Sequence, residues 1–121
     1  MKDFRPLLLV LLVALIVVTS VSGQQYPPPV PRDGATKVFE NDRVAIWDVS
    51  YTKGEQPVHQ HNQDLVRVTL QAGTRKVIDL DGATRNIEDT FGGVQFIPKG
   101  VTHREEGTSD VPTRNILVLL K

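Results

Sequence analysis

Short runs of alternating apolar and polar residues fill the chain from Thr36 onward, and no long stretch repeats with the periodicity of a helix. Alternation with a period of two is typical of a half-buried β-strand, because successive side chains point to opposite faces. The expected strands cover residues 43–51, 64–71, 76–80, 84–88, 93–97 and 113–120. The pattern therefore predicts an all-β domain.

The run at 64–71 shows the alternation most clearly. Val66, Val68 and Leu70 share one face, and Arg67 lies on the other. We expect the apolar face to pack in the core, and both Arg67 and Arg104 to face solvent. Farther along, Asp81 and Gly82 separate two expected strands and predict a hairpin, because the turn needs a positive φ that glycine adopts easily.

The folded part is expected to span residues 36–121. Short strands in a domain of about 90 residues bury little core in an open sheet, and closing them into a small barrel or jelly roll removes the exposed edges. A barrel of this size often pairs with a second copy. The strand at 113–120 is our candidate edge for a homodimer.

The N-terminal segment has the pattern of a targeting element. Lys2 and Arg5 precede an apolar run over 7–18, and small and polar residues follow up to Gly23, which predicts a signal peptide over 1–23. The run is shorter than the roughly 20 residues that span a bilayer. Cleavage would make the protein secreted or periplasmic, whereas an uncleaved segment would anchor it to a membrane.

A proline-rich stretch follows this segment, and the sequence QQYPPPVPR dominates residues 24–35. Proline removes backbone donors and favours extended geometry. We therefore expect a tether between the signal and the domain.

The overall composition excludes several classes of site and partner. Fourteen Lys and Arg residues balance fourteen Asp and Glu residues, so nucleic-acid binding is disfavoured. The chain contains no cysteine, which excludes disulfides, thiolate zinc sites, iron–sulfur clusters and a cysteine nucleophile. Any metal must be bound by nitrogen and oxygen atoms.

The three histidines form the main candidate site. His59 and His61 are two positions apart, so on a strand both imidazoles point to the same face. A turn at 98–100 precedes His103, which a neighbouring strand could bring to the same point. Three neutral imidazoles suit Zn, Fe, Cu, Ni or Mn and leave coordination positions open. The alternative is that His59 and His61 are exposed polar residues of a surface strand.

The residues around these histidines resemble the two motifs of the cupin superfamily. The first motif is similar to Gly54, His59-Gln60-His61, Val66 and Gly73, and the second to Gly92, Pro98-Lys99-Gly100, His103 and Gly107. The resemblance spans residues 44–119. It implies a small jelly-roll β-barrel that holds a divalent metal ion through His59, His61 and His103.

The chain departs from the family pattern at three places. The spacing from Gly54 to His59 is one residue short, and Gly107 replaces the usual asparagine. Val66 stands where the family has its glutamate ligand, so the resemblance implies a three-histidine site. Asp64 is a possible additional ligand if its turn bulges, and otherwise a turn-forming residue. Glu105 is a weaker candidate that we interpret as a solvated charge at the rim.

Three functions remain open. Neutral imidazoles leave the charge of a divalent metal uncompensated, which favours a small anionic or oxygen-donor ligand, with Val66, Val68, Phe96 and Trp47 as apolar surroundings. A binding protein of this kind is our first hypothesis. The second is a metal-dependent enzyme, resembling a dioxygenase or isomerase, that acts on a small organic acid, diketone or phenol. The third is a metal-free barrel that serves as an interaction surface.

Overall fold

The computed structural model describes residues 26–121, and the expected signal peptide lies outside this range. Strands are the only regular elements there, and no helix in these residues is long and apolar enough to cross a membrane. The strands are β1 (Ala35–Glu40), β2 (Val44–Tyr51), β3 (Gly54–Glu55), β4 (His59–Gln60), β5 (Leu65–Gln71), β6 (Gly73–Asp79), β7 (Thr84–Asp89), β8 (Val94–Ile97), β9 (Thr102–Gly107) and β10 (Thr113–Leu120).

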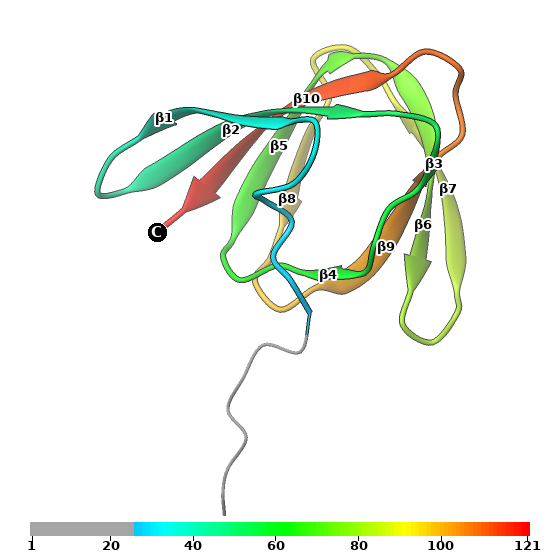
Figure 1. The fold of residues 1–121 in the computed structure, drawn as a ribbon, viewed down its shortest axis with the longest axis horizontal. Coiled ribbons are helices and arrows are strands. Elements are labelled where there is room, and N and C mark those ends of the chain that lie inside the picture. Colours follow the sequence, from blue (N-terminus) through cyan, green and yellow to red (C-terminus); the bar gives the residue numbers. More distant parts are fainter. Residues whose placement is uncertain (1–25) are drawn as a thin grey trace, which may run out of the picture.

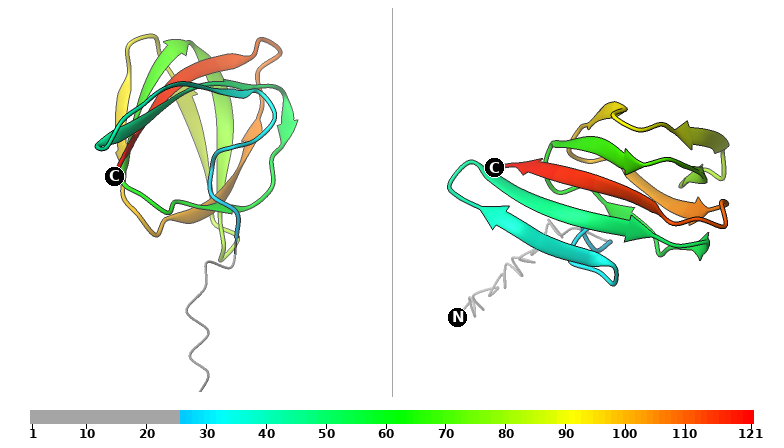
Figure 2. Two further views of the ribbon diagram at one scale, coloured as in Figure 1. Left: turned by 60° about the vertical axis from the view of Figure 1, so that its left-hand side comes forward. Right: turned by 90° about the horizontal axis from the view of Figure 1, so that it is seen from above.

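The strands form two antiparallel sheets that face each other (Figures 1 and 2). One sheet has the order β1-β2-β10-β5-β8, and the other has the order β3-β9-β6-β7 with β4 also paired to β9. The predicted all-β, jelly-roll-like class is confirmed. The prediction that residues 113–120 form an edge is wrong, because β10 pairs with β2 on one side and β5 on the other.

Local sequence signals place most strands within a few residues of their observed bounds. The hairpin between β6 and β7 turns at Gly82, which has a φ of 88° as its turn position requires. Four strands, β1, β3, β4 and β9, lie outside the expected runs. Since β9 carries His103, this strand matters most for the site.

The two faces of β5 are the reverse of those expected. Leu65, Arg67 and Thr69 are buried in the interior, whereas Val66 and Val68 are only half-buried. The expectations of a solvent-facing Arg67 and of a core built on Val66 and Val68 are therefore wrong. Alternation identifies two faces of a strand, but the face that turns inward depends on which partners the interior offers.

The outer face of the five-stranded sheet is unusually apolar. One row of cross-strand neighbours crosses all five strands through Phe39, Ile46, Val118, Val66 and Phe96. The two phenylalanines at its ends are 51% and 59% exposed. Phe96 is therefore more than half exposed, and it also lines a cavity whose wall includes His103, which agrees with its expected place in the apolar surroundings of the site.

The apolar core fills one part of the space between the sheets. It consists of Val30, Ala45, Val49, Tyr51, Leu65, Leu117 and Leu119, with Ala35, Trp47 and Ile97 packed against it.

The proline-rich stretch contributes to this core. Val30 is 5% exposed, and the Pro27 carbonyl accepts a hydrogen bond from the Gln60 amide at 2.9 Å. This stretch was expected to be only a tether, and that interpretation is wrong where Val30 packs, because an apolar side chain there is removed from water by the barrel.

Candidate metal centre

The three histidines belong to one hydrogen-bonded part of the second sheet. His59 on β4 lies directly opposite His103 on β9. Just past β4, the His61 amide donates to the Val101 carbonyl at 2.9 Å, and the His61 carbonyl accepts from the Gly100 amide at 2.7 Å. Gly100 has a φ of 95°, which lets the turn before β9 close against His61.

The ring nitrogens converge as the spacing predicts. The Nε2 atom of His61 lies 3.2 Å from Nε2 of His59 and 3.3 Å from Nε2 of His103, and all three side chains are buried. In a tetrahedral site with metal–nitrogen bonds of about 2.0–2.1 Å, two ligand nitrogens lie about 3.3 Å apart. These two separations match that value, and the three donor atoms all lie within 4.8 Å of one another.

The imidazoles are neutral at ordinary pH. Burial is the main cause that lowers the pKa of His59 to about 4 and that of His61 to about 3, and the neighbouring rings lower both further. Burial also lowers the pKa of His103. A neutral imidazole offers a lone pair, so the donor chemistry fits a transition-metal ion. The Nδ1 atoms of His61 and His103 have no hydrogen-bond partner among residues 26–121.

The additional ligand considered for this site lies elsewhere. The Asp64 side chain is exposed, and its Oδ1 accepts a hydrogen bond from the Lys99 amide at 2.7 Å. It joins its own turn to the turn before β9, and it is not part of the group formed by the three histidines. Val66, at the family's glutamate position, lies on the outer row described above.

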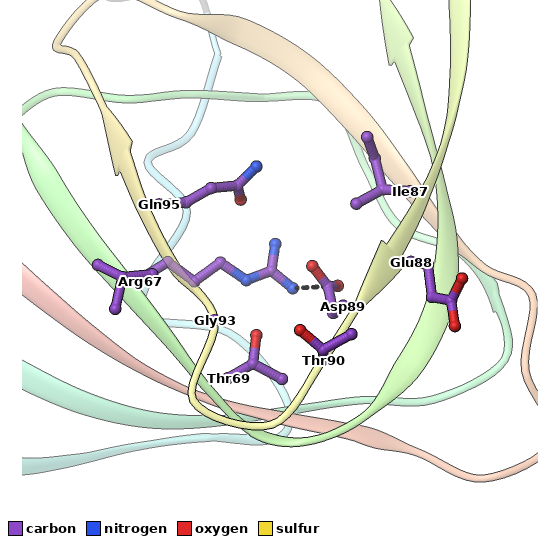
Figure 3. A pocket seen from close by; sticks show the side chains of 9 residues that line it. Arg67, Thr69, Ile87, Glu88, Asp89, Thr90, Gly93 and Gln95 are labelled. Atoms are coloured by element: carbon purple, nitrogen blue, oxygen red, sulfur yellow. Dashed lines mark hydrogen bonds and ion pairs between the residues drawn. The ribbon is translucent and has the colours of Figure 1, made fainter.

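A closed ring of buried ion pairs lies next to the histidines. Asp89 contacts Arg67 at 3.2 Å and Arg75 at 2.7 Å, and Glu105 contacts Arg75 at 3.1 Å and Arg67 at 3.5 Å. Figure 3 shows the Arg67 guanidinium extended toward Asp89. The Nε atom of Arg67 also donates to Oδ1 of Asn115 at 3.1 Å. Two positive and two negative side chains thus compensate each other inside the barrel.

This ring explains two errors of the sequence interpretation. Arg67 is 2% exposed and Glu105 is 4% exposed, so neither is a solvated surface charge. Burial raises the pKa of the Glu105 carboxyl, but Arg67 and Arg75 lower it by more, to about 2. Arg104 is partly exposed and pairs with Glu55 at 2.9 Å. Glu105 is two positions from His103 and shares its face, which is the signal that made it a candidate; its buried arginine partners come from β5 and β6 and were not predictable from that spacing.

Comparisons with known proteins identify the fold. No family model and no curated protein matches the chain. Among solved structures, a cupin domain from Bordetella pertussis Tohama I is similar at 24% identity and a TM-score of 0.66, covering 82% of this chain and 99% of its own. The chain has the cupin fold.

Other similar structures have the same architecture. A cupin with a double-stranded β-helix fold from Methanocaldococcus jannaschii has 17% identity and a TM-score of 0.59, covering 75% of this chain and 85% of its own. The polyketide cyclase RemF from Streptomyces resistomycificus has 19% identity and a TM-score of 0.59, covering 77% of this chain and 71% of its own. These similarities establish the fold. The chemistry of the protein has to be inferred from the residues of the site.

The cupin barrel is open between its edge strands β7 and β8. A cavity of about 190 Å³ lies there, and its lining includes His103, Glu105, Arg75, Gln95 and Val101. A second hollow of about 180 Å³, drawn in Figure 3, is lined by Arg67, Asp89 and again Gln95. The first cavity is lined by His103 and by two members of the ion-pair ring, Arg75 and Glu105, so a small molecule in it would lie against these three side chains.

Proposed function

We propose that this protein is an exported cupin that binds a divalent metal ion and, on that ion, a small anionic or oxygen-donor molecule. His59, His61 and His103 would hold the ion, which can be Fe, Zn, Mn, Ni or Cu. When bound, the metal supplies an electrophilic centre for oxygen ligands. The observation that carries the proposal is the convergence of three buried, neutral imidazoles.

The charges of the interior support an anionic ligand. Arg67, Arg75, Asp89 and Glu105 compensate one another, so the ring adds no net charge to a metal bound by neutral histidines. The ion would keep about two positive charges in a buried place, where a carboxylate or similar oxygen ligand is favoured. The neighbouring cavity has room for a small molecule.

The second function considered is a metal-dependent enzyme, and it needs a group that moves protons. Glu105 is the buried carboxylate nearest the histidines, but its pKa of about 2 makes it a weak base at neutral pH. We therefore place binding ahead of acid–base catalysis. Oxygen uptake by the iron-loaded protein with catechols, diketones and thiols tests the dioxygenase form of this alternative.

Export rests on the N-terminal pattern. Positive residues, an apolar run and small residues up to Gly23 support cleavage, which would start the mature chain at Gln24 and make it secreted or periplasmic. Retention of the segment would instead anchor the protein to a membrane. The mass of the protein recovered from the producing cell distinguishes these outcomes.

Metal analysis of untagged protein tests the central proposal. We expect one divalent ion per chain in the wild type and loss of that ion in His61→Ala, because the variant lacks one of three donors. Asn62→Ala is the matched control, since Asn62 is the next residue and is exposed. An unloaded wild type, or full occupancy in His61→Ala, would contradict the proposed site.

A further inference from the structure

Glu105 brings a carboxylate to the candidate metal centre from an unexpected strand. It lies on β9, on the face that also carries His103, and it is almost fully buried. Its Oε1 atom is 3.8 Å from Nε2 of His103, the nitrogen that lies 3.3 Å from Nε2 of His61. The carboxylate therefore borders the point on which the histidines converge.

The two oxygens of this carboxylate have different surroundings. Oε1 accepts hydrogen bonds from Arg75 at 3.1 Å and Arg67 at 3.5 Å. Oε2 is buried and has no hydrogen-bond partner in the described part of the chain. A buried carboxylate oxygen that accepts no hydrogen bond raises the free energy of the folded protein. Binding of a ligand that donates a hydrogen bond to this oxygen is therefore favoured. The cavity whose wall includes Glu105 and His103 gives such a ligand a place.

We propose that Glu105 selects, among small anionic ligands, those that carry a hydroxyl group beside the oxygen that binds the metal. An α-hydroxycarboxylate has this chemistry, because its carboxylate can bind the ion while its hydroxyl donates to Oε2 of Glu105. The inference rests on the proposed function and adds to it the class of ligand. Glu105 acts here as a specificity residue, and the arginine pair fixes its orientation.

The test compares two probes that differ by one hydroxyl group. Wild-type protein is loaded with Co²⁺, and the binding of lactate and of propionate is followed through the visible absorption of the ion. We expect lactate to bind at least about tenfold more tightly, the effect of one hydrogen bond to a charged acceptor. Equal affinities in the wild type would overturn the inference without any variant.

Two variants test the role of Glu105. In Glu105→Gln the amide oxygen would face the arginines, so an NH₂ group would replace Oε2, and the preference for lactate should fall to what chelation of Co²⁺ by the lactate hydroxyl provides. Glu106→Gln is the matched control, because Glu106 is the next residue of β9 and its side chain points to the opposite face. It should keep the preference. A preference undiminished in Glu105→Gln, or reduced equally in both variants, would refute the assignment.

Co²⁺ uptake distinguishes the two levels of the proposal. If the wild type takes up Co²⁺ but does not discriminate between the probes, the inference about Glu105 fails and the metal site stands. If the wild type takes up no Co²⁺, the proposed function fails, and the inference fails with it. If Glu105→Gln does not fold, Glu105→Asp replaces it in the test. This variant keeps the negative charge but moves the carboxylate away from the site, so it should reduce the preference for lactate over propionate.

Discussion

Removing the Arg67 guanidinium should destabilise the barrel strongly. Arg67 is almost fully buried and contacts Asp89 at 3.2 Å, Glu105 at 3.5 Å and Asn115 at 3.1 Å. In Arg67→Met the long apolar side chain fills much of the same space, but two carboxylates then share Arg75 alone. The ring gains one uncompensated negative charge. Breaking one partner of a buried ion pair costs about 3–5 kcal/mol of unfolding free energy.

Urea unfolding followed by the fluorescence of Trp47 measures this loss. Trp47 is the single tryptophan and packs against the core, so its emission reports the folded state. With a urea dependence of about 1–3 kcal/mol per molar, the midpoint should fall by at least about 1 M. The double variant Arg67→Met/Asp89→Asn restores neutrality in the ring and should recover part of the difference.

Arg114→Met provides the comparison for a surface ion pair. Arg114 pairs with Asp48 on the outside of the barrel, where water screens both charges, so its midpoint should stay near that of the wild type. The reasoning is refuted if Arg67→Met shifts the midpoint no more than Arg114→Met does. That result would mean that the buried charges do not depend on each other.

Two further predictions concern pH and association. Metal-free protein should lose stability as the pH falls from about 6.5 to 4. In the unfolded chain the histidines bind protons near pH 6.5, whereas in the folded protein the pKa is about 4 for His59 and about 3 for His61. Urea midpoints measured with a chelator across this range check the slope, and a constant midpoint would contradict it. The apolar row that ends at Phe96 predicts that two copies associate through the outer face of the five-stranded sheet. In Phe96→Glu, the mass measured by sedimentation should fall to that of one chain. Phe91→Glu is the control at an exposed loop position and should keep the mass of the wild type. A monomeric wild type would disprove the association.

The fold was predictable because its signals are local. Alternation marked most strands, Gly82 marked the hairpin, and the spacing of His59 and His61 placed two imidazoles on one face. The turn ending at Gly100 then indicated that His103 could join them. Each of these inferences needs only neighbouring residues and the geometry of a strand.

The polarity of the interior was not predictable in this way. A single strand cannot show that Arg67 turns inward, since its partners Asp89 and Glu105 come from β7 and β9. The same limit applies to Val30, whose burial depends on the barrel that folds against it. Partners distant in sequence decide which face of an alternating strand is buried, and an inward charge becomes favourable only when they are present.

The pairing of β4 with β9 has a mechanical consequence. His59 and His103 are opposite residues of one ladder, and backbone hydrogen bonds join His61 to the same segment. A small movement of the two sheets relative to each other would change the width of the opening between β7 and β8. It would leave the three histidine ring nitrogens at the same distances from one another. We therefore expect a ligand that widens this opening to leave the spacing of the three candidate metal-binding nitrogens unchanged.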